Sequence, residues 1–184
     1  MPGESTGRAL VTVDEHGENS IVVCAGANGA ITPADIDKGV VASADVLLLQ
    51  LELPGVVVRH AAEAARSVGT QVVLNASPWS AAAIDLVELA DVVIVNEHEE
   101  VELGKVRSSV CVTLGSRGAR WNGIEVPAPK VEVVDTTGAG DAFAGTLAAR
   151  LAMSAGPEES LRAAIVAGAA ACEHLGAQGW GSAR

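Results

Sequence analysis

The chain has 184 residues, 49% of them hydrophobic, which suits one domain with its own core and excludes a disordered protein. Its 23 acidic residues outnumber 12 basic ones, and the net charge of −11 disfavours nucleic acid as a partner. Charges interrupt every apolar run before it reaches membrane-spanning length, and the N-terminus has no signal-peptide pattern. We therefore expect a cytoplasmic protein without a membrane partner.

Two short apolar segments near the N-terminus flank a polar turn. Residues 8–14 and 20–25 are strand-like, and the residues between them, 15–19, are polar, which predicts a β-hairpin. Further along, Thr32 followed by Pro33 supplies a helix N-cap and a proline at the first helical position. This pair predicts a short helix that runs to about Val41.

From residue 45 onward, nearly continuous apolar runs alternate with Ala-rich amphipathic stretches. Runs without polar alternation suit strands that are covered on both faces, and their alternation with helices predicts βαβ units around a parallel sheet. Two further helices are expected at the C-terminal end, separated by Gly156-Pro157. The expected strands are 46–53, 71–75, 91–96 and 110–115, the extended segment is 124–134, and the helices are 56–68, 80–89, 138–153 and 158–174.

Polar segments follow four of the apolar runs or extended segments. They are Gln50 with Glu52, then 96–99, 113–118 and 135–141. In an open α/β sheet, ligands bind at the carboxyl ends of the strands. Because the four segments are expected to converge on one rim of the sheet, that rim is the predicted ligand site.

The most informative segment is VVDTTGAGDAF, residues 133–143, which places a Gly-rich turn at the start of a helix. Free N–H groups of a first helical turn, together with the positive end of the helix dipole, form an anion site. Asp141 in that turn would point at the anion and could accept a proton from an attacking hydroxyl. The alternative is a Gly-rich turn in which Asp141 is an ordinary acidic residue of a helix N-terminus.

The segment DTTGAGDAF, with the apolar run before it and the Ala-rich helix after it, resembles the C-terminal signature of the ribokinase-like (PfkB) carbohydrate kinase family. The resemblance implies an α/β fold with an open, mostly parallel sheet and flanking helices. It also implies that the amides of Gly138, Ala139 and Gly140 bind the γ-phosphate of ATP. Asp141 would then be the general base that deprotonates the sugar hydroxyl.

The resemblance further implies a monovalent cation, K⁺, that organises the phosphate site. Asp135 and the carbonyl of Thr137 would help to bind it. The segment Gly176-Ala177-Gln178 is similar to the C-terminal GAQ of the ribokinase branch, where carbonyls near Ala171, His174 and Gly176 would complete the cation site. Without the resemblance, glycine after a helix is a common C-cap.

Two segments resemble the nucleotide-binding parts of the family. Asn96 and Glu99 are similar to an Asn-x-x-Glu motif, which implies that Asn96 lies near the triphosphate and Glu99 in the water shell of Mg²⁺. The second segment is the loop TLGSRG, whose residues implied to approach ATP are Thr113, Gly115, Ser116 and Gly118. Without the resemblance, the first segment is an acidic helix start and the second is a tight turn.

The segment LQLELP, residues 49–54, resembles the family segment whose glutamate contacts the sugar, so Glu52 is a candidate substrate ligand. Without the resemblance, Glu52 is a solvated carboxylate at a strand end. We interpret residues 1–184 as a single kinase domain, with residues 1–28 as a remnant of the lid hairpin. The N-terminal part of the family is missing, so we expect an open sheet edge that favours a homodimer or other association.

Two functions remain open at this point. The first is ATP-dependent phosphorylation of a sugar hydroxyl, with ribose as the expected sugar. The second is a catalytically impaired nucleotide-binding or interaction module derived from such a kinase. Formation of ADP with and without ribose distinguishes them.

Overall fold

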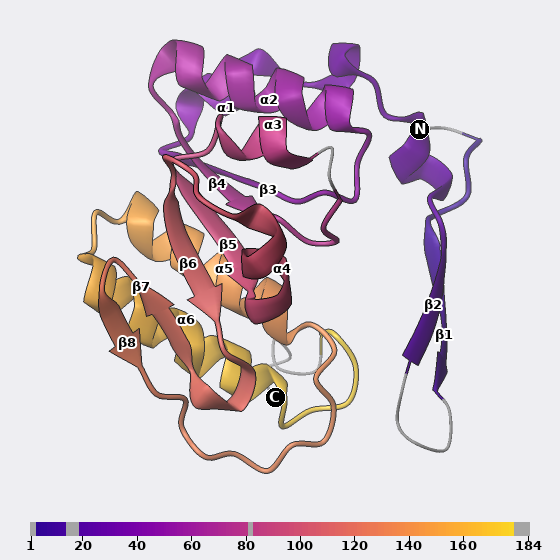
Figure 1. The fold of residues 1–184 in the computed structure, drawn as a ribbon. Helices are drawn as coiled ribbons and strands as arrows, with labels where there is room; N and C mark the ends of the chain where they lie inside the picture. Colours follow the sequence, from indigo (N-terminus) through magenta and orange to yellow (C-terminus); the bar gives the residue numbers. More distant parts are fainter. Residues whose placement is uncertain (1–2, 14–18, 81–82, 179–184) are drawn as a thin grey trace.

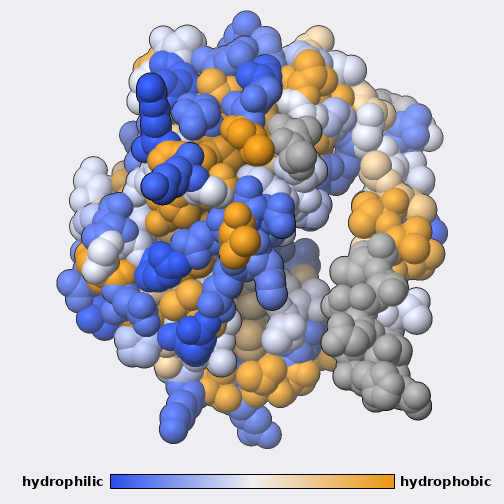
Figure 2. Space-filling model, viewed as in Figure 1, coloured by the Kyte–Doolittle hydropathy of each residue, from blue (hydrophilic) through white to orange (hydrophobic). Residues whose placement is uncertain are grey.

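The computed structural model describes residues 3–13, 19–80 and 83–178, and its strands form two separate sheets (Figure 1). The small sheet is an antiparallel hairpin that stands beside the main body, as predicted. Leu10, Val22 and Val23 on this hairpin are all at least 60% exposed, and hydrophobic side chains gather on this arm in Figure 2. The two strands of the hairpin are β1 (Arg8–Val13) and β2 (Asn19–Cys24).

The main sheet has six strands in the order β3-β4-β5-β6-β7-β8. The first four are parallel and the last two are added antiparallel, which confirms the predicted mostly parallel α/β sheet. The strands are β3 (Val46–Leu49), β4 (Gln71–Asn75), β5 (Val92–Asn96), β6 (Ser109–Thr113), β7 (Ala119–Trp121) and β8 (Ile124–Val126).

Helices cover both faces of this sheet, which explains the lack of polar alternation in its strands. Successive residues of β4 point to opposite faces: Val72 and Leu74 belong to one hydrophobic core, and Val73 belongs to the other. The first core lies under α1 (Lys38–Ser43), α2 (Gly55–Val68) and α3 (Ile84–Val87). The second lies under α5 (Ala139–Ala152) and α6 (Pro157–Ala171), which pack against each other.

The helix predicted from Thr32 to about Val41 is interrupted. Thr32 does cap a turn, because it forms a capping box with Asp35, but that turn is only the 3₁₀ helix η2 (Pro33–Asp35). Asp37 then accepts hydrogen bonds from the backbone N–H groups of Gly39 and Val40 and starts α1. A second capping residue within the expected helix therefore divides it in two.

Three other predicted elements are shorter than expected. The apolar run over 46–53 is a strand only as far as Leu49. The helix expected over 80–89 is the single turn α3, although residues 81–82 lie outside the described residues. The segment expected to be extended over 124–134 is a strand only to Val126, because Pro127 has no N–H to continue the ladder.

No helix among residues 3–13, 19–80 and 83–178 combines the length and the apolar character required to cross a bilayer.

Candidate active site

The Gly-rich turn before α5 is anchored to the end of α6. The backbone N–H groups of Val134 and Asp135 both donate to the carbonyl of Cys172, at 2.8 and 3.2 Å. The turn then places Gly138 immediately before the first residue of α5. The predicted phosphate site is therefore held between two helix ends that are distant in sequence.

Gly138 is required by the fold for two reasons. Its φ of 82° lies in the left-handed region, which L-residues with a Cβ rarely adopt. In addition, a Cβ at this position would lie 2.9 Å from the Cα of Ala177 and 3.0 Å from its carbonyl oxygen. The C-terminal turn thus packs directly onto the glycine of the motif.

Gly140 differs, because a Cβ built there meets no described atom within 4 Å. Its own backbone N–H and that of Asp141 lie in the first turn of α5, where amides have no carbonyl partner within the helix. The N–H of Ala139 donates to the carbonyl of Thr136 at 3.2 Å, so in this conformation it closes the turn. The N–H groups of Gly140 and Asp141 are therefore the amides of this turn that an anion site would use.

Asp141 is exposed, and its side chain reaches the end of a distant strand. Its Oδ1 accepts a hydrogen bond of 2.7 Å from the side-chain amide of Gln50, the residue that directly follows β3. The sequence places both residues on the same rim but gives no signal that they contact each other. Glu52, the predicted sugar ligand, is exposed in the loop after Gln50, and no described residue forms a hydrogen bond or ion pair with its carboxylate.

The structure brings together three of the residues predicted to hold a monovalent cation. Asp135 Oδ1 accepts hydrogen bonds from the N–H and the hydroxyl of Thr137, at 2.9 and 2.7 Å, and its Oδ2 accepts one from the N–H of Gly176 at 2.9 Å. These hydrogen bonds lower the pKa of Asp135 from its usual value; the bond from the Thr137 hydroxyl has the largest effect, and the two backbone bonds add to it. Carboxylate and carbonyl oxygens are suitable ligands for such a cation.

The other two predicted cation ligands lie at the end of α6. Ala171 is buried there, and its carbonyl accepts a hydrogen bond from the N–H of the exposed His174 at 3.3 Å.

Asn96 and Glu99 form a reciprocal capping box at the start of α4 (Glu97–Leu103). The N–H of Glu99 donates to Asn96 Oδ1 at 2.9 Å, and the N–H of Asn96 donates to Glu99 Oε2 at 2.8 Å. Glu99 is only 9% exposed. This pair therefore has a structural role as an N-cap, whatever it binds, and it fixes both side chains at the carboxyl end of β5.

The TLGSRG loop lies beside that capping box, because Asn96 and Thr113 are register partners in β5 and β6. Gly118 has a φ of 108°, and a Cβ there would lie 2.0 Å from the carbonyl oxygen of Val126, so the turn itself requires this glycine. Gly115 also has a positive φ and, like Ser116, is exposed in the 3₁₀ helix η4 (Gly115–Arg117). Arg117 forms an ion pair with Glu97, which ties the loop to α4.

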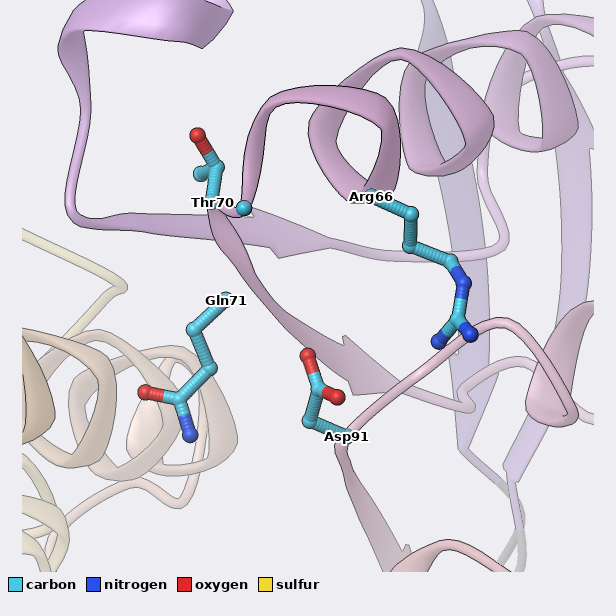
Figure 3. Close-up of a pocket in the computed structure, with 5 residues that line it drawn as sticks. Arg66, Thr70, Gln71 and Asp91 are labelled. Atoms are coloured by element: carbon cyan, nitrogen blue, oxygen red, sulfur yellow. The ribbon is translucent and has the colours of Figure 1, made fainter.

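A hollow of about 470 Å³ lies on the other side of the sheet from this rim, at the amino ends of the strands (Figure 3). It is lined at the amino ends of β4 and β5, where Arg66 donates to the carbonyl of Leu89 and Asp91 accepts from the N–H of Val72. Because the hollow lies at the amino ends of the strands, it is not the site that the sequence predicts at their carboxyl ends.

Among the described parts of the chain, no three His, Cys, Asp or Glu side chains are grouped closely enough to hold a metal ion by themselves. Mg²⁺ in phosphoryl-transfer sites is typically held by one or two carboxylates together with substrate phosphates and water. Glu99 at the carboxyl end of β5 is one such carboxylate, so this end of the sheet fits a mode of binding in which water and the nucleotide supply most of the ligands.

The sequence matches the family model of the pfkB family carbohydrate kinases over residues 1–182. It is 33% identical over 171 residues to a ribokinase of Staphylococcus aureus, a match that covers 79% of this chain and 56% of that protein. It is 35% identical over 173 residues to a bifunctional ribokinase/ribose-5-phosphate isomerase A of Fructilactobacillus sanfranciscensis, covering 80% of this chain and 32% of that protein. The chain therefore spans from about a third to just over half of these two relatives.

Solved structures share the fold. A ribokinase of Thermotoga maritima superposes with a TM-score of 0.80 at 30% identity, over 96% of this chain and 66% of that one. An Arabidopsis thaliana ribokinase complexed with ribose and ATP gives a TM-score of 0.84 at 30% identity, over 95% of this chain and 65% of that one. These matches confirm the predicted ribokinase-like architecture.

Proposed function

We propose that this chain, which belongs to the pfkB family of carbohydrate kinases, carries the site of ATP-dependent phosphoryl transfer to a hydroxyl of a sugar, with ribose as the sugar. The observation that carries the proposal is the placement of Asp141 beside the open amides of the first turn of α5. The same rim of the sheet holds Gln50, Asn96 and Thr113 at three strand ends. A phosphate-binding turn, a base and a nucleotide-binding loop would therefore lie within one site.

In the proposed reaction, the Asp141 carboxylate accepts the proton of the sugar hydroxyl. The sugar oxygen forms a bond to the γ-phosphorus of ATP as the bond to the β,γ-bridging oxygen breaks, which releases ADP. The amides at the start of α5, with the positive end of the helix dipole, stabilise the charge on the transferred phosphoryl group. Catalysis would come mainly from positioning and from this fixed electrostatic environment.

The nucleotide would lie along Asn96, Thr113 and the exposed turn at Gly115 and Ser116. Gly118 supports this role indirectly, since it allows the loop to turn tightly against β8. Mg²⁺, held through Glu99 and water, would neutralise charge on the phosphates of ATP. A K⁺ ion held by Asp135, Thr137 and the carbonyls near Ala171, His174 and Gly176 would support the phosphate-binding turn.

The sugar would be bound by Glu52 and Asp141, and residues 1–28, including the exposed hairpin, would cover it as part of a lid.

We also propose that the chain associates with a second copy or another partner through β3, which ends the strand order of the main sheet. Size-exclusion chromatography with light scattering tests this association. A cytoplasmic location stays a prediction.

The decisive experiment compares the chain with its Asp141→Asn variant. We measure ADP formation with and without ribose, and ATP affinity by calorimetry. We expect ribose-dependent ADP formation to fall by roughly 10²–10⁴-fold, the usual contribution of a general base, while ATP affinity is retained. Glu158→Gln, which removes an exposed acid from the first turn of α6, is the matched control and should leave turnover unchanged.

Two outcomes would contradict the proposal. Unchanged turnover in Asp141→Asn would show that this carboxylate is not the base. ATP binding without any ribose-stimulated turnover in the unmodified chain would contradict the kinase activity and favour a nucleotide-binding module.

A further inference from the structure

The hydrogen bond between Gln50 and Asp141 joins residues 91 positions apart in the chain. Gln50 Nε2 lies 2.7 Å from Asp141 Oδ1, and this is the only hydrogen bond that the described residues give the Asp141 side chain. An ionised carboxylate can only accept hydrogen bonds, so the glutamine must present its NH₂ group to it. The contact is therefore a charge-assisted hydrogen bond, the stronger class of such bonds.

The backbone holds Gln50 firmly in place. The residue before it, Leu49, pairs with Leu74 in the parallel ladder of β3 and β4. The N–H of the residue after it, Leu51, donates to the carbonyl of Ser77 at 3.2 Å. Gln50 is also partly buried, whereas Asp141 is exposed, so the strand end is the fixed partner and the carboxylate is the one it orients.

We propose that Gln50 is a positioning residue for the base. It holds Asp141 Oδ1 so that Oδ2 faces the space above the first turn of α5, where the substrate hydroxyl would lie. The inference rests on the proposed kinase function, but it adds a residue to which the family motifs in this sequence assign no role. Without Gln50, the exposed carboxylate would distribute over several side-chain rotamers and would less often be aligned for proton transfer.

The effect should appear in kcat rather than in binding. A misplacement of about 1 Å at a reacting group can lower the rate on the order of 10²-fold. We therefore expect Gln50→Met, which is similar in length but cannot donate, to lower kcat by roughly 10–100-fold. KM for ribose and the affinity for ATP should change little. Gln50→Glu places a like charge against Asp141 and should lower kcat further.

The test measures kcat, KM for ribose, ATP affinity and Tm for both variants. Gln71→Met is the matched control, because Gln71 lies at the amino end of β4, away from the rim that holds Asp141. An activity-independent readout is the Nε2 resonance of Gln50 in a ¹H–¹⁵N spectrum, which should shift in Asp141→Asn while that of Gln71 does not. Tm values within a few degrees of the unmodified chain exclude a loss of fold.

The outcomes separate this inference from the kinase proposal. If Asp141→Asn abolishes turnover but Gln50→Met leaves kcat unchanged, only the role of Gln50 is refuted. If the Gln50 resonance does not respond to Asp141→Asn, the contact itself is absent in solution and the inference fails. If the unmodified chain has no ribose-dependent turnover, or Asp141→Asn retains it, the kinase proposal and this inference fail together.

Discussion

Replacing Gly138 with alanine should lower the stability of the folded chain through the turn before α5. The new Cβ would lie 2.9 Å from the Cα of Ala177, which is backbone and cannot rotate away. It would also sit on a residue with a φ of 82°. Both effects oppose the native turn, and neither is relieved by moving a flexible side chain.

The magnitude follows from these two contributions. A non-glycine residue in the left-handed region costs about 1–2 kcal/mol. Forcing an additional carbon against packed backbone typically costs about 1–3 kcal/mol. The free energy of unfolding should therefore fall by about 3 kcal/mol, and for a domain of this size the Tm should fall by roughly 6–12 °C.

Thermal unfolding followed by circular dichroism measures this loss, and Gly140→Ala is the matched control two residues away. Alanine at Gly140 meets no described atom and is favoured over glycine in a helix by up to about 1 kcal/mol, so its Tm should be unchanged or slightly raised. If a ligand occupies the space above the turn, Gly140→Ala should nevertheless weaken ATP binding. Equal Tm values for the two variants would refute the reasoning about Ala177.

Two further predictions concern the supporting residues. Asn96→Ala removes the cap of α4 and should lower the free energy of unfolding by about 1 kcal/mol, measured by urea denaturation; Asn96→Ser keeps a capping oxygen and should lose less, so equal losses would contradict the capping role. For Asp135, the folded protein lowers the pKa, so its stabilisation is complete above the usual value and is lost as the pH falls through the lowered value. The difference in Tm between the unmodified chain and Asp135→Asn should therefore be largest at neutral pH and should shrink below about pH 4. A difference that grows on acidification would contradict the assignment.

The parallel core of the fold could be predicted from the sequence because its signals are local. The apolar runs at 71–75 and 92–96 each follow an Ala-rich amphipathic stretch of the sequence, and both form buried strands. Strand β7 was not predicted as an element, although Asn122-Gly123 supplied a signal for the hairpin it forms with β8. Both residues have positive φ, at 51° and 77°, as a two-residue hairpin turn requires.

The position of the candidate residues at one rim of the sheet could be predicted from the sequence, but their contacts could not. The sequence motif places Asp141 in a first helical turn, and the structure agrees. Nothing local, however, indicates that Gln50 would donate to it or that Ala177 would pack on Gly138. These contacts depend on how β3, α5 and the C-terminal turn meet, which tertiary packing decides. The cap formed by Asn96 and Glu99 shows the reverse, since its spacing alone predicts a capping box.

These contacts imply that the geometry of Asp141, the proposed base, and the stability of the C-terminal turn are linked. Asp135 is hydrogen-bonded to Gly176, and Gly138 is packed against Ala177, so the turn before α5 cannot shift unless residues 176–177 shift as well. On its other side, Asp141 is held by Gln50 at the end of β3. The carboxylate is thus positioned by two segments that are far from it in sequence, and disturbing either one should displace it while the hydrophobic cores remain intact.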